Sequence, residues 1–144
     1  MKQNRSLNEL RDFVGGINAA NGFHPEGKPN IGELVALIAS ETSEMLEADR
    51  VNRHSDIEAF SSRMSDIRGS MNPNLTKEQR EVRDIQAYKQ QFKNHIKEGL
   101  EAELVDCLIR CFDTAFRLNI DLDILFDLIT YHNSVRGYKH GKNY

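Results

Sequence analysis

The stretch from Gly32 to Arg50, GELVALIASETSEMLEADR, decides the fold of this chain. It predicts one helix, because its apolar residues recur at spacings that place them on one face. These apolar residues are Leu34, Leu37, Ile38, Met45 and Ala48. At about 100° per residue, Glu41 falls in the middle of the apolar face and Glu44 falls at its edge. Two carboxylates are therefore expected to point toward the core.

A second helix, expected over Gly99 to Asn119, carries another acidic pair. Its apolar face is expected to contain Leu100, Leu104, Cys107, Cys111, Ala115 and Leu118. Glu103 flanks this face, and Asp106 follows one turn later. If the two helices pack antiparallel, four acidic groups meet. All-oxygen ligands of this kind favour Mg²⁺, Mn²⁺ or Ca²⁺ over zinc.

Composition predicts a single domain spanning residues 1–144, since 144 residues with 39% hydrophobic content suffice for one core. The net charge of −3 gives no general attraction to a nucleic acid polymer. No apolar run is long enough for a signal peptide or a membrane span, so we expect no membrane partner and a soluble, cytoplasmic protein.

The two cysteines, Cys107 and Cys111, are expected to be small core residues in a reducing compartment. Metal ligation by this pair is the alternative, but it lacks histidine or cysteine partners at zinc spacing.

The remaining segments also predict helices, so the fold class is all-α. Helices are expected over residues 7–19, around 57–67, from Lys77 after a Thr76–Gln79 capping pattern, and after Asn119. Gly15 and Gly16 are expected to weaken the first helix near its end. No strand-like alternation persists anywhere in the sequence.

Residues 19–30 predict a loop that contains Phe23 and His24. Its aromatic side chains either fold onto the core or form a wall for a flat ligand such as a base.

The segment after the last predicted helix is basic and carries Asn133, Arg136, Lys139, His140 and Lys142. It is either a solvated terminus or a phosphate-binding element. Beside a four-carboxylate metal site the second interpretation gains weight, because Arg and Lys neutralise phosphates whose other oxygens bridge to Mg²⁺.

Three motifs together carry a family resemblance: E-x-x-E at Glu41 and Glu44, E-x-x-D at Glu103 and Asp106, and N-x-x-R-x-x-x-H-G-K from Asn133 to Lys142. Over residues 31–142 the chain resembles the MazG-like nucleotide pyrophosphohydrolases of the all-α NTP pyrophosphatase superfamily. The interval between the acidic pairs is longer than in that family, so residues 51–98 are expected to carry an inserted helical segment.

The resemblance implies a helical bundle that hydrolyses a nucleoside triphosphate (NTP or dNTP) to the monophosphate and pyrophosphate, in nucleotide-pool housekeeping. It implies Mg²⁺, with Mn²⁺ as a possible substitute, and a homodimer or homotetramer. The implied metal ligands are Glu41, Glu44, Glu103 and Asp106, and the implied substrate contacts are Asn133, Arg136 and Lys142, to which the basic tail adds Lys139 and the loop adds Phe23. Glu41 and Glu44 are also expected to be catalytic residues.

Glu47, one turn after Glu44, is a further catalytic candidate that would orient water, or else a solvated residue. Ser40 and Ile129 stand where some family members have an acidic residue and a lysine. Two other functional classes stay open: a non-catalytic bundle that binds nucleotide or metal as a regulator, and a structural bundle whose acids pair with Arg110, Arg117 or Lys97.

Overall fold

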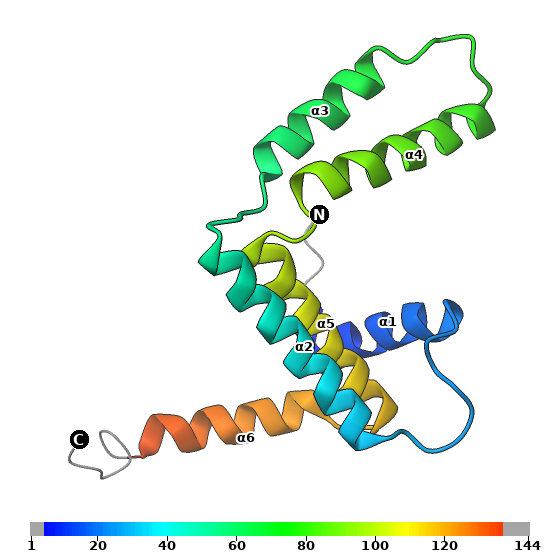
Figure 1. The fold of residues 1–144 in the computed structure, drawn as a ribbon. Helices are drawn as coiled ribbons and strands as arrows, with labels where there is room; N and C mark the ends of the chain where they lie inside the picture. The colour runs from blue at the N-terminus through cyan, green and yellow to red at the C-terminus, as the bar shows by residue number, and fades with distance from the viewer. Residues whose placement is uncertain (1–4, 137–144) are drawn as a thin grey trace. The chain divides into compact units, whose positions relative to one another are not determined.

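The chain is all-helical in the computed structural model, which describes residues 5–136 (Figure 1). Within those residues there are six helices and no strand, so the predicted all-α class is confirmed. The helices are α1 (Leu7–Ala20), α2 (Ile31–Arg50), α3 (Ile57–Gly69), α4 (Lys77–His95), α5 (Leu100–Arg117) and α6 (Leu122–Val135).

The chain divides into two compact units. The first contains residues 1–34 and 109–144, and the second contains residues 35–108. Both α2 and α5 begin in one unit and end in the other. The predicted insertion, 51–98, lies wholly within the second unit. The single domain expected over residues 1–144 stays a prediction, because a compact unit is not by itself an independent domain.

In the first unit, hydrogen bonds join the N-terminal half of α1 to the segment at the start of α6. Ser6 caps α1 in a capping box with Glu9. The backbone N–H of Leu7 donates to Asp123 at 2.8 Å, and the guanidinium of Arg11 donates to the carbonyl of Ile120 at 2.6 Å.

Helix α1 continues through Gly15 to Ala20, one residue beyond the predicted range, and the weakening of the helix by its glycines stays a prediction. A Cβ added at Gly15 would lie 2.1 Å from the ring of Phe116, so only glycine permits this close approach. His24 stacks on the same ring, with 5.7 Å between centroids, and hydrogen-bonds to Asp113 at 2.8 Å. The loop histidine therefore folds onto its own unit.

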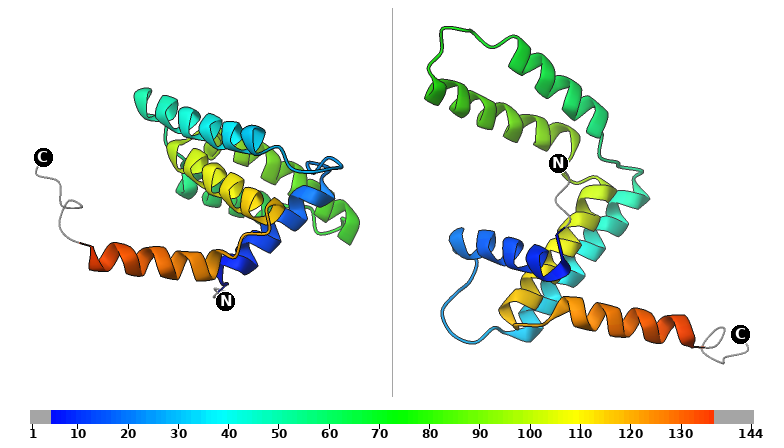
Figure 2. Two further views of the ribbon diagram at one scale, coloured as in Figure 1. Left: turned by 90° about the horizontal axis from the view of Figure 1, so that it is seen from below. Right: turned by 180° about the vertical axis from the view of Figure 1, so that it is seen from behind.

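In the second unit, α2 and α5 run side by side and antiparallel, as Figures 1 and 2 agree. The helices α3 and α4 form a hairpin, in which the guanidinium of Arg68 binds both oxygens of Asp84 at 2.6 and 2.9 Å. The predicted capping box of Thr76 and Gln79 begins α4.

The segment after α2 is hydrogen-bonded to the last residue of α4 and to the first residue of α5. The carbonyl of Arg53 accepts from the backbone N–H of Leu100 at 3.0 Å, and the carbonyl of His95 accepts from the N–H of Asp56 at 2.7 Å. The ends of the hairpin are thus fixed at the paired ends of α2 and α5.

The apolar face of α5 differs from the predicted one. Leu104 is 48% exposed and Cys111 is exposed, whereas Glu103 is 4% exposed. In the second unit α5 packs through the face that contains Glu103, with Leu100 and Cys107 half-buried beside it. Cys111 lies in the part of α5 that belongs to the first unit, and its side chain is exposed there, so the expectation that it is a core residue is wrong.

No helix in the described part of the chain combines the length and apolar character that crossing a membrane would require.

Candidate metal centre

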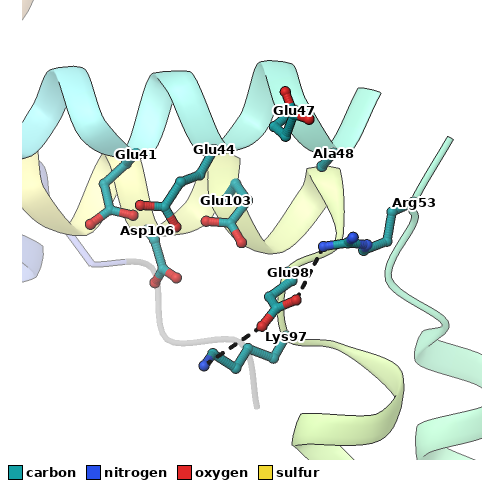
Figure 3. A pocket seen from close by; sticks show the side chains of 9 residues that line it. All are labelled: Glu41, Glu44, Glu47, Ala48, Arg53, Lys97, Glu98, Glu103 and Asp106. Atoms are coloured by element: carbon teal, nitrogen blue, oxygen red, sulfur yellow. Dashed lines mark hydrogen bonds and ion pairs between the residues drawn. The ribbon is translucent and has the colours of Figure 1, made fainter. Parts of the chain in front are cut away.

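The four carboxylates predicted as metal ligands line one cavity in the second unit. Glu41 and Glu44 come from α2, and Glu103 and Asp106 come from α5 (Figure 3). The cavity has a volume of about 310 Å³, at the lower end of the range for small-molecule sites. The two acidic helices are antiparallel, which is the arrangement under which the sequence predicted that both acidic pairs meet.

The position of Glu41 follows from the periodicity of α2. Leu34 and Ala48, seven residues before and after Glu41, are each 3% exposed, and Glu41 is 9% exposed. Because residues seven apart lie on nearly the same side of a helix, Glu41 is forced inward between its apolar neighbours. Glu44, one turn later, is exposed, and its carboxylate accepts from the Ser40 hydroxyl at 3.2 Å.

Three of the four carboxylates are close enough to share an ion. One oxygen from each of Glu41, Glu44 and Glu103 lies within 4.8 Å of the other two. Opposite oxygens around Mg²⁺ are about 4.2 Å apart at its usual bond length, and those around Ca²⁺ about 5 Å. The three groups can therefore hold one metal ion after small movements, and their all-oxygen chemistry suits a hard divalent cation.

The electrostatics of the cavity are dominated by anions. Burial is the largest cause that raises the pKa of Glu103, and repulsion from Glu44, Asp106, Glu41 and Glu98 adds to it. Glu103 makes no hydrogen bond or ion pair through its side chain within the part of the chain that the structure describes. A buried carboxylate in this state gains most from a cation that enters the cavity.

Asp106 and Glu47 stand apart from this set of three. Asp106 lines the same cavity but does not belong to the three carboxylates that lie within 4.8 Å of one another. The Glu47 carboxylate is 65% exposed, accepts from Arg50 at 3.1 Å, and is directed away from Glu41 and Glu44 (Figure 3). The catalytic role of Glu47 stays a prediction.

The predicted substrate contacts lie elsewhere in the chain. Phe23, in the loop before α2, is 63% exposed. Asn133 belongs to α6, and Arg136 follows its last residue; both are in the first unit. Lys139 and Lys142 lie outside the described residues. The roles of all these residues stay predictions.

Two cations at the edge of the cavity were missed by the sequence analysis as ligand contacts. Arg53 and Lys97 line the cavity together with Glu98. Lys97, which the structural-bundle interpretation pairs with one of the four acids, lies 3.9 Å from Glu98. Neither cation belongs to a periodic helical face, so only the fold brings them to the carboxylates.

Comparison with known proteins adds no relative. No family model, no curated protein and no solved structure matches this chain. The MazG-like family therefore remains an expectation from the three sequence motifs.

Proposed function

We propose that the chain is a Mg²⁺-dependent nucleoside triphosphate pyrophosphohydrolase of the MazG-like type. The observation that carries the proposal is the meeting of Glu41, Glu44 and Glu103 in one cavity, with oxygens within 4.8 Å of one another. The order of motifs along the chain supports a nucleotide as the substrate. Mg²⁺ is preferred, with Mn²⁺ as a substitute, because both take oxygen ligands.

In this proposal the residues of α2 and α5 hold the ion. Glu41, Glu44 and Glu103 supply the ligands, with Asp106 on the same wall, and the Ser40 hydroxyl holds one Glu44 oxygen. A divalent cation polarises phosphoryl oxygens and lowers the pKa of a coordinated water. Carboxylates gathered in one cavity are suited to such an ion because its positive charge reduces their mutual repulsion.

The overall reaction joins a water oxygen to the α-phosphorus of the nucleotide. The bond from that phosphorus to the α,β-bridging oxygen breaks, and pyrophosphate leaves. Glu47 is our candidate for orienting the water, after a change from its present pairing with Arg50. Asn133, Arg136, Lys139 and Lys142 are our candidates for contacts to the nucleotide.

We also propose a homodimer or homotetramer. Support comes from α6, on which six large apolar side chains are more than half exposed: Ile124, Phe126, Leu128, Ile129, Tyr131 and Val135. A helix with this much exposed apolar surface is usually covered in the native state. The molar mass in solution, measured by light scattering, tests this expectation.

The test of function is release of pyrophosphate from a panel of NTPs and dNTPs, with Mg²⁺, with Mn²⁺ and with a chelator. The proposal expects pyrophosphate and monophosphate in equal amounts, only with metal. Release of inorganic phosphate and a diphosphate would contradict it. Metal binding without any release would instead favour a regulatory nucleotide- or metal-binding bundle.

A further inference from the structure

Two cations and one bridging anion stand at the edge of the metal cavity. The guanidinium of Arg53 lies 3.1 Å from one oxygen of Glu98, and the ammonium of Lys97 lies 3.9 Å from the other oxygen (Figure 3). The side chains of Arg53 and Lys97 are 51% and 60% exposed, so both are open to a ligand. The Glu98 carboxylate thus lies between two cations, and an anionic ligand can bind at the same position.

The backbone holds these groups at the cavity. Arg53 donates its N–H to the carbonyl of Ala48 at 2.9 Å, and its carbonyl accepts from Leu100 at 3.0 Å. Glu98 has a φ of 65°, a left-handed conformation that is unfavourable for a residue with a Cβ. The positions of Arg53 and Glu98 are therefore set by the junction between the helices, and not only by their surface ion pair.

Gly99 permits this junction. A Cβ at Gly99 would lie 2.4 Å from the backbone nitrogen of Ser55 and 2.5 Å from its hydroxyl. Only glycine lets residues 53–55 approach the start of α5 this closely. The same contact keeps Arg53 beside the carboxylates.

An independent observation indicates a ligand in the cavity. Glu103 is 4% exposed, lines the cavity, and has no side-chain partner among the described residues. A buried anion without a partner favours the binding of a cation. The two exposed cations at the same edge share the single carboxylate of Glu98, which favours the binding of a further anion. A metal ion complexed with a phosphate chain supplies both charges in one ligand.

We propose that Arg53 and Lys97 bind the pyrophosphate portion of the substrate, which displaces Glu98 from between them. The inference rests on the proposed function of the metal cavity and names its ligand class: a metal-complexed pyrophosphate group. The cavity volume of about 310 Å³ suits the phosphates and leaves the nucleoside to contacts elsewhere. Glu98 then acts as an internal competitor that sets the affinity for phosphate.

The test is a calorimetric titration of the full chain with inorganic pyrophosphate in the presence of Mg²⁺. The double substitution Arg53→Gln/Lys97→Gln should weaken pyrophosphate binding at least about tenfold, because two charge-assisted contacts are lost. Its affinity for Mn²⁺ alone should stay within about twofold of that of the unaltered chain. The matched control is Arg63→Gln/Lys93→Gln, which removes two exposed cations of α3 and α4 that do not line the cavity.

Glu98→Gln should change the pyrophosphate affinity in the opposite direction, and a misfolded protein would not bind more tightly. It should tighten pyrophosphate binding about two- to fivefold, the range expected when an exposed ion pair no longer competes. Equal pyrophosphate affinity in the double variant and the unaltered chain would overturn the inference, as would absence of pyrophosphate binding to the unaltered chain. If the double variant does not fold, unchanged or weaker binding by Glu98→Gln overturns it.

The proposed function fails separately. If pyrophosphate binding depends on Arg53 and Lys97 but no nucleotide of the panel is hydrolysed, the hydrolase is rejected and the phosphate site stands.

Discussion

Glu101 and Glu103 lie two residues apart in the first turn of α5, yet their surroundings are opposite. Glu101 accepts from the backbone N–H of Ser55 at 2.8 Å and pairs with His54 at 2.9 Å, and these two contacts lower its pKa to about 2. Glu103 is buried without such a partner among the described residues, and its pKa is raised. A helix N-terminus favours both anions. Burial and neighbouring charge therefore decide the difference: Glu101 stabilises a junction, and Glu103 is left for a cation.

The largest expected effect comes from removing the charge of Glu103. Glu103→Gln should lower metal-dependent turnover at least about a hundredfold. Mutation of a residue that only orients a metal ligand already lowers activity about 10- to 100-fold, and loss of the ligand itself should cost more. Glu41→Gln and Asp106→Asn should act in the same direction. Steady-state release of pyrophosphate measures this effect. Asp49→Asn, which removes an exposed carboxylate of α2 outside the cavity, is the charge-matched control.

The junction held by Glu101 can be broken sterically at Gly99. Gly99→Ala should lower the free energy of unfolding by about 1–3 kcal/mol, because the added methyl group overlaps the backbone of Ser55. Denaturation in urea measures this loss. At Gly69 a Cβ meets nothing within 4 Å, so Gly69→Ala should leave stability unchanged or slightly higher. Equal effects of the two substitutions would contradict the close contact.

Stability should respond to Glu103→Gln in the opposite direction from activity. In chelator, the variant should unfold with a free energy about 0.5–2 kcal/mol higher than that of the unaltered chain, because an ionised carboxylate is removed from an anionic cavity. Urea denaturation without metal measures this gain. A loss of stability instead would mean that Glu103 is paired and has a structural role.

The fold followed from periodicity and capping, and the acidic pairs followed from their i, i+3 spacing on predicted faces. Thr76 and Gln79 begin α4 with the capping box that the sequence predicted. The prediction for α5 was wrong at Leu104 and Cys111, which are exposed, although Ala115 on the same face is buried. Apolar character alone does not decide which positions of a helix its neighbours cover. Arg53, Lys97 and the contact at Gly99 depend on a junction between segments about 45 residues apart, and no local pattern encodes such proximity.

The free energy of unfolding should depend on pH in opposite ways for Glu101 and Glu103. The lowered pKa of Glu101 contributes stability above about pH 4.5, and this contribution is lost as the pH falls through about 2. Glu101→Gln should therefore be less stable than the unaltered chain at neutral pH and equal to it near pH 2. For Glu103, whose pKa is raised, the ionised form costs stability above that pKa, and the cost disappears as the pH falls. Urea denaturation between pH 2 and pH 7 measures both differences, and curves of the same sign would contradict the comparison.

A calorimetric titration with Mn²⁺ of the unaltered chain, Glu103→Gln and Asp49→Asn tests the metal centre between α2 and α5. We expect binding by the unaltered chain, an affinity at least about tenfold weaker for Glu103→Gln, and an affinity within about twofold of the unaltered chain for Asp49→Asn. Equal affinity of Glu103→Gln and the unaltered chain, or no binding by the unaltered chain, would contradict a metal centre between α2 and α5.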